Sequence, residues 1–224
     1  MNTLKTILTF SHITCGILVL LIGLIIMIAQ PKGNAVHKKL GWVYYLAMCW
    51  ISISSIVGML LFKFYFFLFP IAIFSFHLVY SGFRSIKLKN STKAAWYDWL
   101  VATSTLLVGV GLLIYGFNII GTNTGLGILS LVFGFFIGWS GLEDCLLYKN
   151  LTKQKKMWWW FHHMRGMLGG YLAALTAFLV QNGEMIPAIG QSWIIWVAPG
   201  VVGGIGIGRW TKYYKKKFDS ANLN

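Results

Sequence analysis

The side chains of this sequence that could do chemistry are five histidines and a few carboxylates. His77 and His163 each lie inside a long apolar stretch, and His12 lies a few residues into another one. Neutral imidazole binds haem iron and zinc, and an ionisable group inside a membrane span is costly unless it has a function or a partner. These histidines therefore predict either a cofactor site or hydrogen-bonded contacts between helices.

Three acidic residues stand at the ends of apolar stretches, where they can meet the histidines. Asp98 opens one stretch, whereas Glu143 and Asp144 close the next one. An acid at a helix N-terminus is favourable to the helix dipole, so Asp98 also fits a structural role. Glu143 and Asp144 oppose the dipole near a helix C-terminus and need a cationic partner such as Arg165. A structural ion pair and a catalytic carboxylate are both open for them.

Three kinds of site follow from these residues. A haem b site needs two imidazoles at similar depth on facing helices, and His77 with His163 is the favoured pair, with His37 and His12 as weaker candidates. A zinc site, as in a membrane hydrolase, would combine several histidines with a carboxylate base. Its candidate residues are His37, His77, His163, Asp98, Glu143 and Asp144. A transporter or small-molecule binding protein would use the same cluster as a proton or ion relay.

Helical spacing distinguishes the adjacent histidines His162 and His163. His163 shares a face with Gly166 and Gly170, and small residues mark the faces at which membrane helices approach closely. His162 is rotated by about 100° from that face, since a helix has 3.6 residues per turn. The spacing therefore predicts that His163 points into a helix bundle and that His162 faces the membrane interface.

The composition indicates that these residues belong to a membrane protein. Of the 224 residues, 57% are hydrophobic and only 11% are charged, whereas a soluble domain carries about 25% charged residues. So much apolar surface cannot be buried in a core of this size, and lipid must cover part of it. Soluble, disordered and disulfide-framework classes are excluded. The cysteines Cys15, Cys49 and Cys145 all lie in apolar stretches and are expected to be packing residues.

Seven apolar stretches are each long enough to cross a bilayer, whose core of about 30 Å needs roughly 20 helical residues. They cover residues 7–29, 40–62, 64–86, 99–120, 126–148, 159–180 and 192–210. The sequence thus predicts an all-α, polytopic membrane helix bundle with seven transmembrane helices, forming a single domain over residues 1–224. Only Lys63 separates the second stretch from the third, which predicts a tight hairpin. A ridge of Gly200, Gly204 and Gly208 predicts a helix contact on the seventh.

The positive charges predict the orientation of the bundle. Loops on one side carry Lys5 and Lys63 alone, and loops on the other side carry nearly all the remaining lysines. By the positive-inside rule the N-terminus lies outside and the C-terminus lies on the cytoplasmic side of the membrane. The net charge of +14 therefore indicates cytoplasmic loops, not nucleic-acid binding. The basic tail from Lys212 to Lys217 predicts contact with anionic lipids of the bilayer.

Motifs of soluble cofactor enzymes are absent from the sequence. It has no Walker A loop, no dinucleotide fingerprint, no CxxC pair and no HExxH helix. Seven-helix ceramidase-like enzymes are an analogy for a zinc hydrolase, but their His-x-x-x-His helix is missing here. Whether the chain is an enzyme is open at the level of sequence.

Two segments resemble a known family. The segment Ala35–Ala47 (AVHKKLGWVYYLA) carries a His, basic residue, Leu-Gly and Tyr pattern, and the segment His163–Phe178 (HMRGMLGGYLAALTAF) carries a second helical His. They resemble a bacterial multipass membrane family classed as a domain of unknown function, number 2306. The order Arg165-Gly166 departs from that family's pattern, so no role is carried to Arg165. The resemblance implies an inner-membrane protein and points to His37 and His163.

Overall fold

The chain folds into seven long helices, and the computed structural model describes residues 2–29, 31–185 and 193–220. No β-strand occurs within these ranges, so the predicted all-α fold is confirmed. The helices are α1 (Asn2–Ile28), α2 (Ala35–Leu61), α3 (Leu68–Leu88), α4 (Trp96–Ile119), α5 (Thr124–Lys149), α6 (Trp158–Gln181) and α7 (Ile194–Ser220). Two short 3-10 helices, η1 (Leu151–Lys153) and η2 (Gly183–Met185), precede and follow α6.

Five of the seven helices are long and apolar enough to cross a membrane, namely α1, α2, α4, α5 and α7. The other two, α3 and α6, have 21 and 24 residues, which is also sufficient length. Their polar side chains set them apart, since α3 carries His77 and Arg84, and α6 carries His162, His163 and Arg165. These two helices, which are not among the five candidate spans, thus carry three of the candidate histidines.

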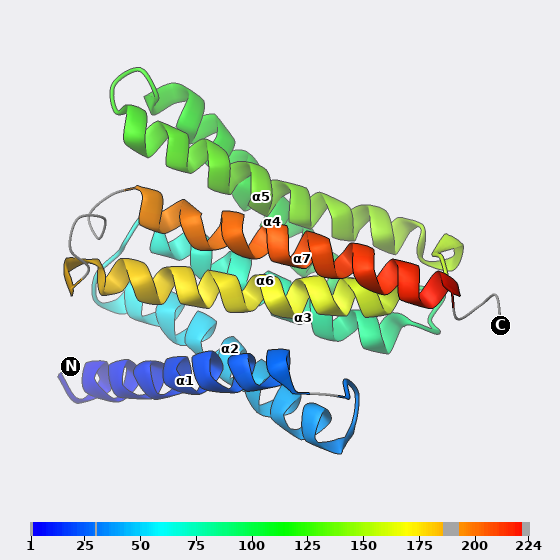
Figure 1. Ribbon diagram of the computed structural model, residues 1–224. Helices are drawn as coiled ribbons and strands as arrows, with labels where there is room; N and C mark the ends of the chain where they lie inside the picture. Colours follow the sequence, from blue (N-terminus) through cyan, green and yellow to red (C-terminus); the bar gives the residue numbers. More distant parts are fainter. Residues whose placement is uncertain (1, 30, 186–192, 221–224) are drawn as a thin grey trace.

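The polar helices lie at the centre of the bundle. Helix α3 contacts α2, α4, α5 and α6, and α6 contacts α1, α3 and α7. Figure 1 shows α1 with α2 and α4 with α5 as two antiparallel pairs on opposite sides of α3 and α6, with the termini at opposite ends. The apolar helices thus cover the two helices that lipid would solvate least well.

Glycines allow α3 and α6 to approach closely. A Cβ atom added at Gly166 would lie 2.5 Å from the carbonyl oxygen of Leu78 and 2.8 Å from the Cα of Gly82. A Cβ added at Gly170 would lie 2.5 Å from Cγ1 of Val79. The predicted small-residue face of α6 is therefore confirmed, and it packs on α3.

The glycine ridge predicted on α7 does not pack against another helix. No atom lies within 4 Å of a Cβ added at Gly200, Gly204 or Gly208, whereas a Cβ added at Gly203 would meet the side chain of Leu172. The predicted contact face is therefore wrong. The reason is that α7 packs mainly on α6 alone, so most of its circumference faces outward.

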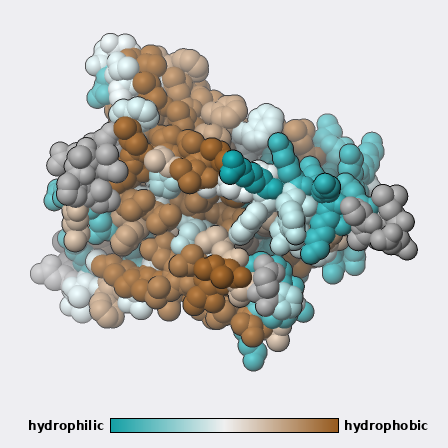
Figure 2. All heavy atoms as spheres, viewed as in Figure 1, coloured by the Kyte–Doolittle hydropathy of each residue, from teal (hydrophilic) through white to brown (hydrophobic). Residues whose placement is uncertain are grey.

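Several helix boundaries differ from the predicted span limits, and α1 and α2 each begin five residues earlier, at Asn2 and Ala35. The third helix begins at Leu68, not at residue 64, because the chain turns through residues 62–67. Pro70 lies in the first turn of α3, where a proline is tolerated. The seventh helix continues past residue 210 to Ser220. Its tail has an aromatic side, on which Tyr214 lies 4.7 Å from Trp160 between ring centroids, and this contact stabilises the extension. Figure 2 shows that hydrophilic residues gather most strongly at this end of the molecule.

The contact between α3 and α6 gives a first prediction. Gly166→Leu should lower the free energy of unfolding by about 1–3 kcal/mol, because the new side chain would collide with backbone atoms of α3 that cannot move aside. Thermal denaturation of the purified protein in detergent measures this. Gly204→Leu is the control, since it adds the same side chain in open space and should be nearly neutral. Equal losses in the two variants would contradict the close contact.

Candidate functional site

A cavity of about 620 Å³ opens at the end of the bundle that contains the last turns of α7. It is bounded by α1 and the loop after it, the first turns of α2, the end of α3, the start of α6 and the tail of α7. We call this cavity, lined by Lys32, His37, Lys87, Lys89 and His163 among others, the basic-end pocket. Its volume is within the range of small-molecule sites.

Two imidazole rings face each other in the basic-end pocket. The ring centroids of His37 and His163 are 6.4 Å apart, and the ring planes are inclined by 69°. Nδ1 of His163 lies 3.0 Å from the carbonyl oxygen of Gly82, and a carbonyl can only accept, so Nδ1 carries the proton and donates. The Nε2 atom of His163 is left with its lone pair and has no hydrogen bond within the described part of the chain.

His37 is held by the start of α2. The side-chain oxygen of Asn34 caps this helix by accepting a 2.8 Å hydrogen bond from the backbone N–H of His37. The side chain is half-buried, and its ring makes no hydrogen bond to any residue that the structure describes. Gly41 follows one turn later on the same face of α2, lines the pocket, and has open space where a side chain would be. The surface of α2 one turn after His37 therefore has no side chain that would keep a ligand away from the backbone.

Lysines give the pocket a strong positive charge. Lys38, Lys87 and Lys89 are exposed at its mouth and form no ion pair within the described ranges, and no acidic residue lines the pocket. Lys32 is turned inward, where its Nζ donates to the carbonyl oxygens of Ile26, Met27 and Ala29 at the end of α1. Burial lowers the pKa of Lys32. An anion in this pocket would meet cations without a competing carboxylate.

The walls of the pocket are aromatic. The rings of Trp42 and Phe83 pack edge to face with centroids 5.0 Å apart, and Trp160 lies 4.7 Å from Tyr214. Nζ of Lys89 lies 5.5 Å from the ring centre of Trp159, which places a cation beside an apolar wall. The pocket thus combines a cationic mouth with a large apolar interior.

A second polar cluster, separate from this pocket, joins α3, α5 and α6. Asp144 accepts from His162, with a distance of 2.9 Å between Oδ1 and Nε2, and its Oδ2 lies 3.5 Å from Nε2 of His77. The side chains of His77 and Asp144 are 1% and 2% exposed. Ser81 Oγ lies 2.7 Å from Nε2 of His162. A buried carboxylate between two imidazoles is thus enclosed by the three helices.

This cluster overturns the predicted pairing of His77 with His163. His77 faces Asp144 and His162, whereas His163 faces His37. His162 is also interior, since its side chain is only 13% exposed, so its predicted position at the membrane interface is wrong. The physical reason is that α6 has neighbours on several sides, and adjacent residues on it therefore meet different helices.

The other two acids are held in ion pairs. Asp98 is fully buried and accepts from Nε and Nη2 of Arg84 at 2.6 and 2.7 Å, from the Tyr80 hydroxyl at 2.7 Å, and from the backbone N–H of Ala95 at 2.9 Å. The predicted position of Asp98 at a helix N-terminus is confirmed. Glu143 pairs with Arg165 at 2.8 Å, so this predicted ion pair is also present.

The residues proposed for zinc are therefore divided among separate places. His37 and His163 lie at the pocket, His77 and Asp144 lie in the buried cluster, and the remaining acids are occupied by arginines. Among the residues described, no group of three or more histidine, cysteine, aspartate or glutamate side chains is placed to hold a metal ion. The geometry does not assemble the predicted zinc set.

His12, one of the two weaker haem candidates, lies away from both clusters. Its Nδ1 is 2.9 Å from the Ser54 hydroxyl, and this contact joins α1 and α2.

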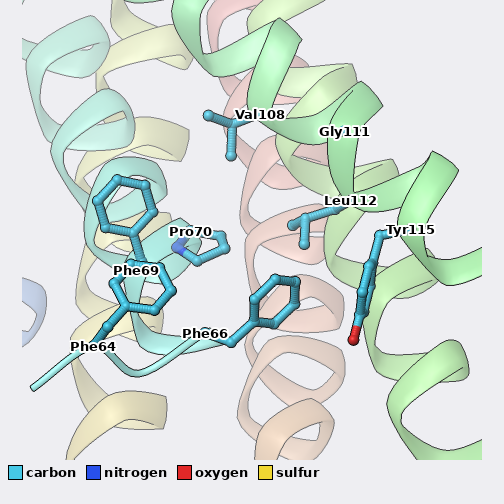
Figure 3. Close-up of a pocket in the computed structure, with 8 residues that line it drawn as sticks. All are labelled: Phe64, Phe66, Phe69, Pro70, Val108, Gly111, Leu112 and Tyr115. Atoms are coloured by element: carbon cyan, nitrogen blue, oxygen red, sulfur yellow. The ribbon is translucent and has the colours of Figure 1, made fainter. Parts of the chain in front are cut away.

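A separate apolar cavity of about 340 Å³ lies beside the start of α3 and is lined by α4 residues such as Tyr115. Figure 3 shows Phe64 and Phe69 on one side of it and Tyr115 on the other, with the ring of Phe66 beside Tyr115 at 4.6 Å between ring centroids. It offers no ionisable group for chemistry, and the three cysteines are free thiols.

The lysines of the pocket and Gly41 are the parts of the site that sequence reasoning missed. Lys32, Lys87 and Lys89 were expected only to mark a cytoplasmic side. One signal was available, since His37, Gly41 and Tyr44 recur at helical spacing and therefore share one face.

No protein-family model, curated protein or solved structure matches this chain. What the pocket binds has to be inferred from its own chemistry.

Proposed function

We propose that this chain is a seven-span protein of the bacterial inner membrane that binds a small anionic amphiphile in the basic-end pocket. The observation that carries the proposal is a pocket with lysines at its mouth, aromatic walls and no acidic lining residue. A ligand with a carboxylate or phosphate group and an apolar body would satisfy both parts. The apolar body would enter between α2 and α6, and the anionic group would stay near Lys87 and Lys89.

The orientation belongs to the same proposal. We place the N-terminus outside and the basic end in the cytoplasm, because lysines favour the cytoplasmic side of a bacterial membrane. The pocket would then open at the level of the cytoplasmic headgroups, where amphiphiles are concentrated. Anionic lipids would contact the basic tail of α7, which carries Lys212, Lys215 and Lys217 and whose Tyr214 lines the pocket.

Topology reporters test the orientation. Fusions after Asn90 and Asn150, in the loops at the basic end, should report the cytoplasm, and fusions after Asn123 and Gly183 should report the periplasm. The expected result follows from seven spans with alternating loops. Alkaline phosphatase and green fluorescent protein fusions measure the two sides. A cytoplasmic signal after Asn123 would contradict seven alternating spans.

Charge reversal at the pocket mouth tests the binding function. A dansyl-labelled long-chain carboxylate should bind the purified protein. The double variant Lys87→Glu/Lys89→Glu should bind it at least about thirtyfold more weakly, since two lysines near an anionic group contribute about 1 kcal/mol each. The methyl ester of the same probe should bind weakly to both proteins. Probe fluorescence in a detergent titration gives the affinities.

A matched pair of lysines controls for net charge. Lys153→Glu/Lys155→Glu makes the same change in total charge on the exposed connection between α5 and α6, which does not line the pocket. It should leave the affinity of the carboxylate nearly unchanged. Equal weakening by both double variants would mean that general attraction, and not the pocket, binds the probe.

A further inference from the structure

We infer that the amphiphile is haem b, and that its iron is held between His37 and His163. This inference rests on the proposed function, because it identifies the ligand of the same pocket. Haem is an anionic amphiphile with an apolar macrocycle and two carboxylates, and it differs from other amphiphiles by needing axial ligands for its iron. The sequence favoured His77 as the partner of His163, and the structure assigns that role to His37.

The spacing of the two rings fits one metal ion between them. Two imidazoles that bind a metal from opposite sides, each at a metal–nitrogen distance of about 2 Å, have ring centroids about 6 Å apart. The centroids of His37 and His163 are 6.4 Å apart. Two free rings in a T-shaped contact can have the same separation, and the haem titration below distinguishes these two arrangements.

The hydrogen bonding of the rings also suits ligation. His163 donates from Nδ1 to the Gly82 carbonyl, which fixes the tautomer and leaves the Nε2 lone pair for a metal. A backbone carbonyl is a common partner of a metal-bound imidazole. Half-buried imidazoles without a partner for one nitrogen lose hydrogen bonds to water on folding, and iron would compensate for this loss.

His77 cannot take the place of His37. Its Nε2 lies beside Asp144, its ring is 1% exposed, and Asp144 also binds His162, so this imidazole is enclosed by three helices. It does not line the basic-end pocket. A macrocycle could not reach it without separating α3 from α5.

The pocket around the two rings fits a flat macrocycle with carboxylates at one edge. Gly41 lies one turn from His37 with open space in place of a side chain, so a porphyrin face could approach the backbone of α2. Trp42 and Phe83 offer apolar surfaces beside it. Lys87 and Lys89 at the mouth are suited to bind the two propionates. A haem iron with both histidines as ligands would be six-coordinate.

Spectroscopy of the purified full chain tests the inference. Protein reconstituted with ferric haem should bind one equivalent and show a Soret band of a low-spin iron, and after reduction with dithionite the spectrum should not change on addition of carbon monoxide. His37→Ala and His163→Ala each open one coordination position, so their reduced forms should bind carbon monoxide. The affinity of each variant for ferric haem should also be lower than that of the wild type by a factor of at least roughly ten. His12→Ala, a histidine outside the pocket, should behave like the wild type.

Metal-free protoporphyrin separates this inference from the proposed function. It has the same macrocycle and carboxylates but no iron, so it should bind wild type and both pocket histidine variants with similar affinity. If haem binds no better than protoporphyrin, or its spectrum is unchanged in His37→Ala and His163→Ala, the iron ligation is overturned while amphiphile binding stands. If haem, protoporphyrin and the dansyl carboxylate all fail to bind folded protein, the proposed function falls as well. His163→Met retains a ligand and reports a shifted spectrum if His163→Ala does not fold.

Discussion

Asp98→Ala should lower the free energy of unfolding by about 3–5 kcal/mol, because breaking a buried ion pair leaves the other charge without a partner. Asp98 is fully buried and accepts four hydrogen bonds, two of them from Arg84. Its removal would leave the guanidinium of Arg84, whose side chain is 18% exposed, and the Tyr80 hydroxyl without this acceptor in an apolar surrounding. Unfolding in mixed detergent micelles, followed by circular dichroism, measures the loss.

The second carboxylate–guanidinium pair of the chain is a matched control. Glu143 and Arg165 are 39% and 44% exposed, so water screens their attraction. Glu143→Ala should therefore cost no more than about 1 kcal/mol. If both substitutions lower the free energy of unfolding equally, burial does not decide the strength of these ion pairs. That result would contradict the buried contact between Arg84 of α3 and Asp98 of α4.

Gly41→Phe should block the basic-end pocket and weaken binding of the dansyl carboxylate at least about tenfold. No atom lies within 4 Å of a Cβ added at Gly41, and this residue lines the pocket, so the new ring would take the space of a ligand without colliding with the protein. The fold should tolerate the change, since glycine inside a helix is unfavourable. Thermal denaturation and probe titration on the same preparation measure the two effects.

Gly204→Phe separates filling of the pocket from the general effect of a larger side chain. Gly204 also has open space around it, but it lies on α7 and does not line the pocket. This variant should bind the probe like the wild type. Unchanged binding in Gly41→Phe would mean that the ligand does not enter between α2 and α6.

Much of the fold could be predicted from the sequence, because span length and helical periodicity are local properties. The seven helices fall close to the seven apolar stretches, and the small face of Gly166 and Gly170 contacts α3 as expected. The glycines of α7 show the limit of this reasoning. Gly200, Gly204 and Gly208 also recur one turn apart, as glycines of a close helix contact do. However, α7 lies at the edge of the bundle, and no helix packs on this face.

The site could be predicted only in part, because it depends on which helices become neighbours. The sequence identified the histidines and placed His163 on an interior face, but it could not show that His162 and His163 would meet different partners. The inward turn of Lys32 depends on the loop after α1, which brings its Nζ back to the last carbonyls of that helix. Neither contact follows from periodicity within one helix.

Locating a bound probe tests the central proposal most directly. A diazirine-bearing long-chain carboxylate, cross-linked to the purified protein and mapped by mass spectrometry, should label residues 37–44 of α2 and 160–171 of α6, which line the basic-end pocket. Excess unlabelled acid should remove this labelling, and its methyl ester should not. Labelling that is spread over outward-facing residues such as Val202 and Ile205, or that is confined to the apolar cavity near Tyr115, and that the acid leaves unchanged, would contradict an anion-binding function of the pocket.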